Sequence, residues 1–109
     1  MQVTSIKVQS GEIVRISGEI NLDTSPDLRK ACIELLDKGE KDIVVSLKEV
    51  SYLDSAGLAT LIELLQKIKG KGGTLKLCGL SDSVRTVFEL NKLDTIFSLF
   101  PSEEDALKQ

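Results

Sequence analysis

The segment Ile43–Leu47 is a short, nearly continuous apolar run that is bounded by polar residues. A run of this length is typical of a strand that is buried on both faces, as in a parallel sheet covered by helices. From Leu58 to Ile68 apolar residues then recur at helical spacing, which predicts the strongest amphipathic helix of the chain. A buried strand followed by a long amphipathic helix indicates an α/β fold, because the helix crosses the sheet to reach the next parallel strand.

The remaining elements are predicted from two periodicities of apolar residues, alternation for strands and a spacing of three to four residues for helices. Alternation predicts strands over 3–8, 13–17, 74–78 and 96–100, with a turn at Gly11-Glu12 and with Gly18 ending the second strand. Capping residues and helical spacing predict helices from Thr24 or Ser25 to Gly39, from Ser81 or Asp82 to Asn91, and over 102–107. Residues 48–53 are interpreted as a connector. The sequence thus predicts one α/β domain over residues 1–109, with a mixed, mainly parallel sheet of about four to five strands that opens with a β-hairpin and packs against about four helices.

Composition argues against several classes of function. The chain contains no histidine, so a Ser-His-Asp or Cys-His site cannot be built from its own residues. This disfavours a small hydrolase with Ser55 as the nucleophile. The net charge of -3 gives no reason to expect a nucleic acid or an anionic membrane as partner. Cys32 and Cys78 lie far apart in apolar patterns and are interpreted as buried hydrophobic residues.

The first residues show no basic region followed by an apolar run, which is the pattern of a secretory signal. No apolar stretch approaches the roughly 20 residues that cross a bilayer. We therefore expect a cytoplasmic protein that does not enter a membrane.

The segment Tyr52–Leu58 is the first candidate site, because it leads from the central strand region into the best helix. Asp54 and Ser55 suit a helix cap, a structural role worth about 1 kcal/mol that needs no further function. Gly57, however, costs about 1 kcal/mol inside a first helical turn compared with Ala. With Ala56 it flanks the serine with small groups, which would leave the hydroxyl reachable by another protein. A phosphate on Ser55 would add roughly -1.5 to -2 charges at a helix start that tolerates anions.

The segment from Gly18 to Thr24 is the second candidate. A strand is predicted to end at Gly18 and a helix to begin after Asp23, so Asn21, Asp23 and Thr24 are expected at the same edge of the sheet. A plain loop with a helix cap is the alternative interpretation.

The run Val50-Ser51-Tyr52-Leu53-Asp54-Ser55-Ala56-Gly57-Leu58 resembles the phosphorylation motif of bacterial anti-sigma-factor antagonists, the stand-alone members of the STAS domain family. Upstream, Gly18-Glu19-Ile20 resembles the Gly-Glu-(Leu/Ile)-Asp segment of the same family, and the order of elements matches over essentially the whole chain. The partner-binding residues that this resemblance implies are Asn21, Asp23, Thr24, Asp54, Ser55, Ala56, Gly57 and Leu58.

The resemblance implies a switch rather than an enzyme. The unphosphorylated antagonist binds an anti-sigma factor that is itself a serine kinase of the GHKL type, and this releases the sigma factor. Phosphorylation at Ser55 then weakens the complex, and a PP2C-type phosphatase reverses the modification. ATP and the metal ions belong to these partners, so no cofactor or metal is expected in this chain, and a monomer suits a protein that must expose one face.

Two positions depart from the family pattern. Asn21 stands where the family usually has aspartate, which keeps hydrogen-bonding capacity but removes a negative charge, and Ala59 stands where glycine is common. Asn21 leaves an alternative open, in which the chain is a STAS module that is not phosphorylated and binds a nucleotide, a lipid or a scaffold partner.

Overall fold

The computed structural model describes residues 1–108 and shows one five-stranded sheet with four helices. The strands are β1 (Gln2–Val8), β2 (Gly11–Ile20), β3 (Asp42–Leu53), β4 (Thr74–Cys78) and β5 (Ser98–Phe100). The helices are α1 (Ser25–Asp37), α2 (Ser55–Gly70), α3 (Asp82–Leu90) and α4 (Glu103–Leu107). The strands lie side by side in sequence order, and β1 is antiparallel to β2 whereas the other neighbours are parallel. The α/β class, the opening hairpin and the mainly parallel sheet are confirmed.

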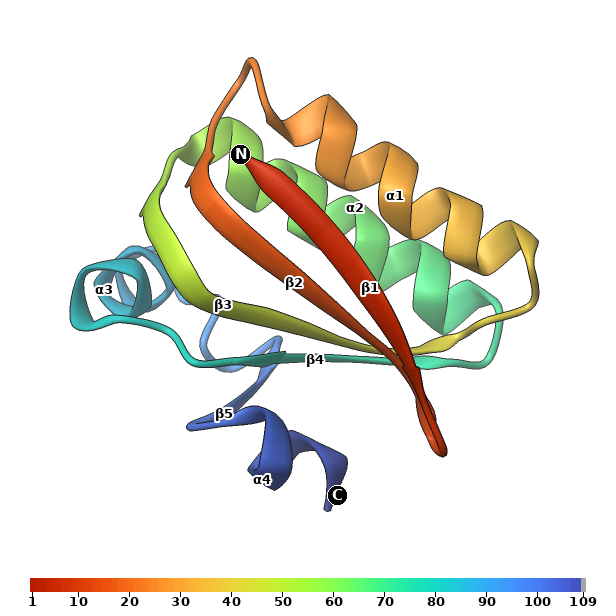
Figure 1. Ribbon diagram of the computed structural model, residues 1–109. Helices are drawn as coiled ribbons and strands as arrows, with labels where there is room; N and C mark the ends of the chain where they lie inside the picture. Colours follow the sequence, from red (N-terminus) through yellow and green to blue (C-terminus); the bar gives the residue numbers. More distant parts are fainter. Residues whose placement is uncertain (109) are drawn as a thin grey trace.

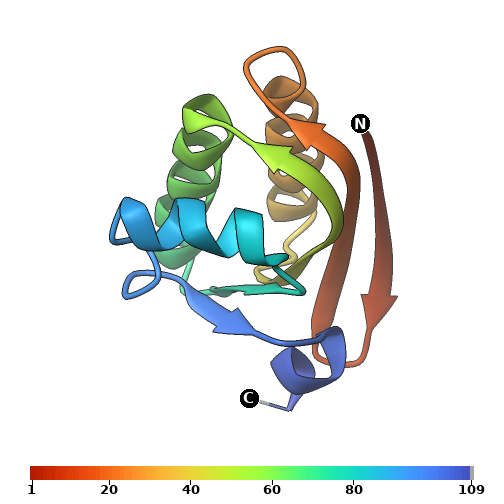
Figure 2. The same cartoon turned by 90° about the vertical axis from the view of Figure 1, so that its left-hand side faces the viewer.

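Helices α1, α2 and α3 cover one face of the curved sheet, and α4 lies against the other face (Figures 1 and 2). The apolar stripes of the first three helices form the main core with the sheet. This core includes Leu28, Cys32 and Leu35 from α1, Leu61, Leu64 and Ile68 from α2, and Val84 and Phe88 from α3. A second, small cluster lies under α4. Both cysteines are free and buried, as expected.

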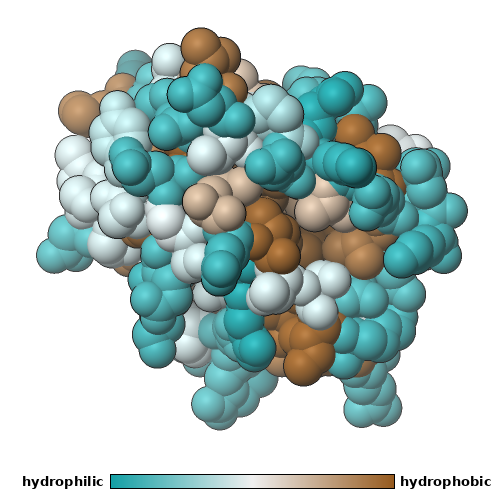
Figure 3. Space-filling model, turned by 45° about the horizontal axis from the view of Figure 1, so that its top comes forward, coloured by the Kyte–Doolittle hydropathy of each residue, from teal (hydrophilic) through white to brown (hydrophobic). Residues whose placement is uncertain are grey.

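Seen from above the helices, the surface is mainly hydrophilic, and hydrophobic residues occupy separate spots and a hollow (Figure 3). Among residues 1–108, every helix falls short of the length and apolar character that a membrane-spanning segment requires.

Strands β2 and β3 are longer than the sequence suggested. Gly18 does not end β2, which continues to Ile20, and residues 48–53 are the second half of β3 rather than a connector. Register shifts in the pairing of β2 with β3, at Arg15/Ser17 and at Gly18/Glu19, interrupt the alternation of inward and outward side chains. Alternating apolar residues therefore do not indicate the second halves of these strands in the sequence. Because β4 pairs with β3 only up to Ser46 and β1 pairs with β2 only up to Ser17, the last residues in the far halves of β2 and β3 pair with each other alone. They project as a two-stranded ribbon that carries the candidate site.

Smaller boundaries also differ. The hairpin turn lies at residues 9–10 instead of Gly11-Glu12, and the last strand covers 98–100 instead of 96–100. Of the open capping alternatives, the hydroxyl of Ser81 caps α3 by accepting from the Val84 amide. Thr24 is the N-cap residue of α1, but its side chain makes no capping hydrogen bond there.

The start of α2 packs very closely against the ends of β2 and β3. A Cβ atom added to Gly57 would lie 2.5 Å from Cδ1 of Leu53 and 2.8 Å from the carbonyl oxygen of Ile20. The backbone oxygen cannot move aside as a flexible side chain would. Glycine is therefore required by internal packing at this position.

We expect Gly57→Ala to lower the free energy of unfolding by roughly 1–2 kcal/mol, because overpacking outweighs the gain in helix propensity of about 1 kcal/mol. Gly70→Ala is the matched control, since it lies in the same helix and its added Cβ would meet nothing within 4 Å. This control is expected to be neutral or slightly stabilising. Urea denaturation of the two variants measures the difference, and equal effects of both substitutions would contradict the packing argument.

Candidate functional site

The two candidate segments meet because β2 and β3 end at the same level of the sheet. Ile20, the last residue of β2, pairs with Leu53, the last residue of β3. Asn21 and Asp54 therefore leave adjacent parallel strands side by side, and the amide of Asp54 donates to the carbonyl of Ile20 at 3.1 Å. The carboxyl ends of parallel strands are the usual place for a functional site in α/β folds.

The carboxylate of Asp54 connects the two segments. Its Oδ1 accepts from the Gly57 amide at 2.9 Å and caps α2, so the capping role expected for this residue is confirmed. Its Oδ2 accepts from the Leu22 amide at 3.2 Å. One carboxylate thus holds the loop after β2 against the first turn of α2.

The loop after β2 is a compact hydrogen-bonded turn around Asn21. The Oδ1 atom of Asn21 accepts from the amides of Asp23 at 2.9 Å and Thr24 at 3.0 Å. The Thr24 hydroxyl donates to the carbonyl of Glu19 at 2.8 Å and accepts from the Asn21 amide at 2.9 Å. An aspartate at position 21 would present the same oxygen to the same amides. The departure from the family pattern therefore changes the charge of this turn but not its hydrogen-bond acceptor.

Ser55 is the first residue of α2 and is exposed. Within residues 1–108, its hydroxyl makes no hydrogen bond. Ala56 beside it is half-buried, and Ala59, one turn along the helix, is exposed. The hydroxyl is therefore sterically accessible, and the free amides of the helix N-terminus lie next to it. Chemically, this arrangement can present an acceptor oxygen to a phosphoryl donor.

Two expected partner-binding residues lie beneath this surface. Gly57 is buried, and Leu58 is only 5% exposed and belongs to the main core. The expectation that Gly57 leaves room for another protein is therefore corrected, because its missing side chain makes room for Leu53 and Ile20. Gly57 and Leu58 position the helix start, whereas Asn21, Asp23, Thr24, Asp54, Ser55 and Ala56 are at least partly exposed.

The structure adds two residues that the sequence analysis missed. Leu22 is 73% exposed at the tip of the loop, and its backbone is fixed by the Asp54 carboxylate. Tyr52 is 51% exposed and pairs with Glu19 just before the strands end. Leu22 could have been found from the sequence, because it is a large apolar residue between the polar residues of a predicted turn. The exposure of Tyr52 became visible only once 48–53 was known to be a strand.

Known proteins share this fold and much of this sequence. The STAS domain matches residues 4–106. The anti-sigma-B factor antagonist of Bacillus subtilis is 34% identical over 95 residues, which are 87% of this chain and 86% of that protein. The anti-sigma F factor antagonist of Paenibacillus polymyxa is 31% identical over 98 residues, covering 89% of this chain and 84% of that protein.

Solved structures agree with the sequence relatives. An anti-sigma factor antagonist from Mycobacterium paratuberculosis has a TM-score of 0.89 at 27% identity, and the match covers 98% of this chain and 91% of that one. The Bacillus cell fate determinant SpoIIAA in its phosphorylated form has a TM-score of 0.77 at 19% identity, covering 98% and 97%, which shows likeness of fold. With its signature sequence at the paired ends of β2 and β3, the chain belongs to the STAS domain family.

Proposed function

We propose that this protein is an anti-sigma-factor antagonist whose binding to an anti-sigma factor is switched off by phosphorylation of Ser55. The observation that carries the proposal is the exposed Ser55 hydroxyl on the first residue of α2, inside the family signature. The names of the relatives from Bacillus subtilis and Paenibacillus polymyxa support the same function.

The docking surface consists of the loop 21–24 and the exposed residues at the start of α2. Leu22 is its apolar centre, and Asn21, Asp23 and Asp54 are polar residues around it. An apolar side chain with a polar rim is the usual arrangement of an interface hot spot. The two hydrogen bonds of Asp54 keep this surface rigid before binding, which reduces the entropy lost in the complex.

Electrostatics gives the switch its direction. The segments 17–28 and 50–62 contain four acidic residues, Glu19, Asp23, Asp27 and Asp54, and neither contains a lysine or an arginine. A phosphate on Ser55 finds no basic side chain in these segments with which to form an ion pair. It adds like charge to an acidic surface, and its own desolvation opposes docking. The amides at the N-terminus of α2 accommodate the anion, so the fold persists while the complex weakens.

The partners are those that the family resemblance implies. The anti-sigma factor is a GHKL-type serine kinase that supplies ATP and magnesium, and a PP2C-type phosphatase restores the free hydroxyl. The antagonist contributes the acceptor side chain and the docking surface but no catalytic group. It acts in the cytoplasm as a monomer, because the same surface must meet the kinase and the phosphatase in turn.

The decisive experiment incubates the protein with the GHKL-type anti-sigma kinases of its own genome, ATP and magnesium. We expect a single phosphate on Ser55, identified by mass spectrometry. We expect Ser55→Asp to weaken binding to the same kinase by about tenfold or more, and Ser55→Ala to bind without being modified. Isothermal titration calorimetry compares the three affinities.

Circular dichroism is the control for folding of both Ser55 variants. The proposal fails if every kinase that binds the protein leaves Ser55 unmodified, or if Ser55→Asp binds as tightly as the unmodified protein. A nucleotide or lipid head group that binds in place of any kinase would support the alternative STAS module.

Leu22→Ala is expected to weaken anti-sigma-factor binding by roughly tenfold, because it removes the exposed apolar side chain at the centre of the surface. Its folding stability should not change, since the Leu22 side chain is largely in solvent. Ile6→Ala is the matched control, because Ile6 is also exposed but lies on β1, near the opposite ends of the strands. Equal affinity of the two variants would remove Leu22 from the docking surface.

Two substitutions of Asn21 distinguish the effect of its hydrogen bonds from the effect of charge at this position. Asn21→Ala removes the acceptor of the Asp23 and Thr24 amides and is expected to cost about 1 kcal/mol of stability and to weaken docking. Asn21→Asp keeps the acceptor, so its stability should match the unmodified protein, while the added charge shifts the kinase affinity and strengthens its dependence on salt. Thermal unfolding and calorimetry at two salt concentrations measure both effects. A loss of stability in Asn21→Asp would contradict this account of the turn.

A further inference from the structure

The face of the sheet opposite α1 and α2 is covered only in part. Helix α4, the one helix on this face among the described residues, has five residues and lies across β3, β4 and β5 (Figure 2). An isolated helix of this length is not stable in water, so its contacts with the sheet hold it. These contacts are polar at both ends and apolar between them.

The acidic end of α4 is held by basic and polar groups of the sheet. Both guanidinium contacts from Arg15 to the Glu103 carboxylate are 2.9 Å long, which is a bidentate pair. Ser46 and Lys48 line the same cavity as Glu103, and both contribute to lowering the pKa of its carboxyl group. The hydrogen bonds from Arg15 in particular hold the pKa of Glu103 below its ordinary value, while partial burial opposes this shift. Arg15, Ser46 and Lys48 thus form a carboxylate-binding site on β2 and β3.

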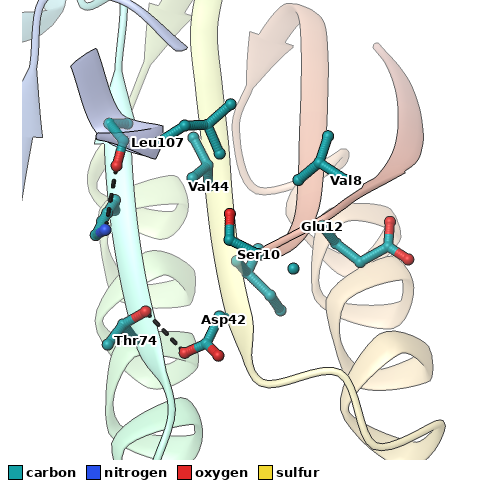
Figure 4. A pocket seen from close by; sticks show the side chains of 11 residues that line it. Val8, Ser10, Glu12, Asp42, Val44, Thr74 and Leu107 are labelled. Atoms are coloured by element: carbon teal, nitrogen blue, oxygen red, sulfur yellow. Dashed lines mark hydrogen bonds between the residues drawn. The ribbon is translucent and has the colours of Figure 1, made fainter. Parts of the chain in front are cut away.

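The other end of α4 is held by Lys76, whose amine donates to the carbonyl oxygen of Ala106 at 3.1 Å. Between the two ends, Ala106 is fully buried against Ile13, Val44 and Cys78. Leu107 reaches from α4 over β3 toward Val44 (Figure 4). The apolar side of α4 therefore packs on a small hydrophobic surface of the sheet.

This groove is larger than its present occupant. A cavity of about 680 Å³ lies at the start of α4, between Arg15, Lys48, Cys78 and Glu104. A second cavity of about 290 Å³ lies beside the end of α4, between Val8, Asp42, Thr74 and Leu107 (Figure 4). Next to it on β1, Ile6 pairs with Ile13 and remains 46% exposed. Glu103 occupies the carboxylate site, while the surface on either side of α4 is left open.

We propose that this groove is a second docking surface, which takes an acidic amphipathic helix of a partner protein in place of α4. The occupant follows from the contacts that now hold α4, because Arg15 binds a carboxylate in a bidentate pair and the surface beside it is apolar. The cavities are lined by basic and acidic residues of the sheet alike, so the match is to one carboxylate at Arg15 and not to a generally basic groove. The partner helix carries a carboxylate for Arg15, followed three and four residues later by apolar side chains, which is the spacing of Glu103, Ala106 and Leu107. A longer helix also fills the two flanking cavities. The surface lies on the opposite face of the sheet from α2, so it is independent of the Ser55 switch.

The first test releases α4 in the full chain. Glu103→Lys places like charge against Arg15 and is expected to raise the rate of Cys78 alkylation by iodoacetamide about tenfold or more, because α4 covers this thiol. Cys32 is the internal control, since it lies in the main core and burial raises its pKa to about 12. Glu63→Lys is the matched variant, because it breaks the 2.8 Å ion pair with Arg29 on the helical face. It should leave Cys78 protected.

The second test measures the binding of a separate helical peptide to the groove. The probe is a fluorescein-labelled peptide of residues 101–108, stapled at positions 104 and 108, which are exposed. Fluorescence anisotropy is expected to show binding to the Glu103→Lys protein at least about tenfold tighter than to the unmodified protein, whose own α4 competes. Arg15→Glu should abolish binding, and a peptide with Glu103→Lys should restore it.

Each outcome decides the proposal. Release of Cys78 together with peptide binding that depends on Arg15 supports it. Protection of Cys78 in Glu103→Lys, or release of Cys78 without peptide binding, overturns it. If Cys32 also becomes reactive, the whole fold has opened, and Glu103→Gln is then used with the same criteria.

Discussion

The geometry of the candidate site depends on the close approach of the first turn of α2 to the end of β2. The Gly57 backbone lies against the Ile20 carbonyl, and the Asp54 carboxylate holds both the helix amide and the Leu22 amide. If this approach were looser, Asp54 could still cap its helix but would no longer reach the loop after β2. The position of Ser55 relative to Leu22 therefore depends on a glycine and a carboxylate, Gly57 and Asp54, which fix the geometry of the proposed docking surface.

A site built on the ends of paired strands suits regulation by charge. The ribbon formed by the far halves of β2 and β3 ends at Ile20 and Leu53, and both residues are buried in the core. A phosphate added at the tip meets a support that is already well packed, so the modification alters the surface rather than the fold. On the other face, α4 is held by one bidentate ion pair and a small apolar cluster. The molecule thus combines a rigid surface at the ends of β2 and β3, where we propose a phosphorylation switch, with a second face that is covered by one short helix.

Local signals in the sequence were sufficient for the class of fold and for the candidate segments. The apolar run at Ile43–Leu47, the stripe of α2 and the Asp54 cap each depend on residues close in the chain, and the structure agrees with all of them. The second half of β3 was missed because β3 itself carries an extra residue at each of two bulges, which break its alternation, so that Val50 and Leu53 are buried three positions apart. The bond between Leu22 and Asp54 joins residues 32 apart, and the Arg15–Glu103 pair joins residues 88 apart. Sequence periodicity cannot predict such pairs, because they form only when the strands are paired in the sheet.

Asn21 shows why geometry and charge must be judged separately at a regulatory surface. The resemblance drew attention to a missing negative charge, yet the structure shows that the side-chain oxygen organises the turn by accepting two amides. Asparagine supplies that oxygen as well as aspartate does, so the turn, the exposure of Leu22 and the bond to Asp54 can be kept while one negative charge near Ser55 is removed. A position of this kind allows the charge of the proposed docking surface to change without disturbing the fold. The same logic applies to α4, where Glu103 provides both the contact that holds the helix and the charge that a competing helix must match.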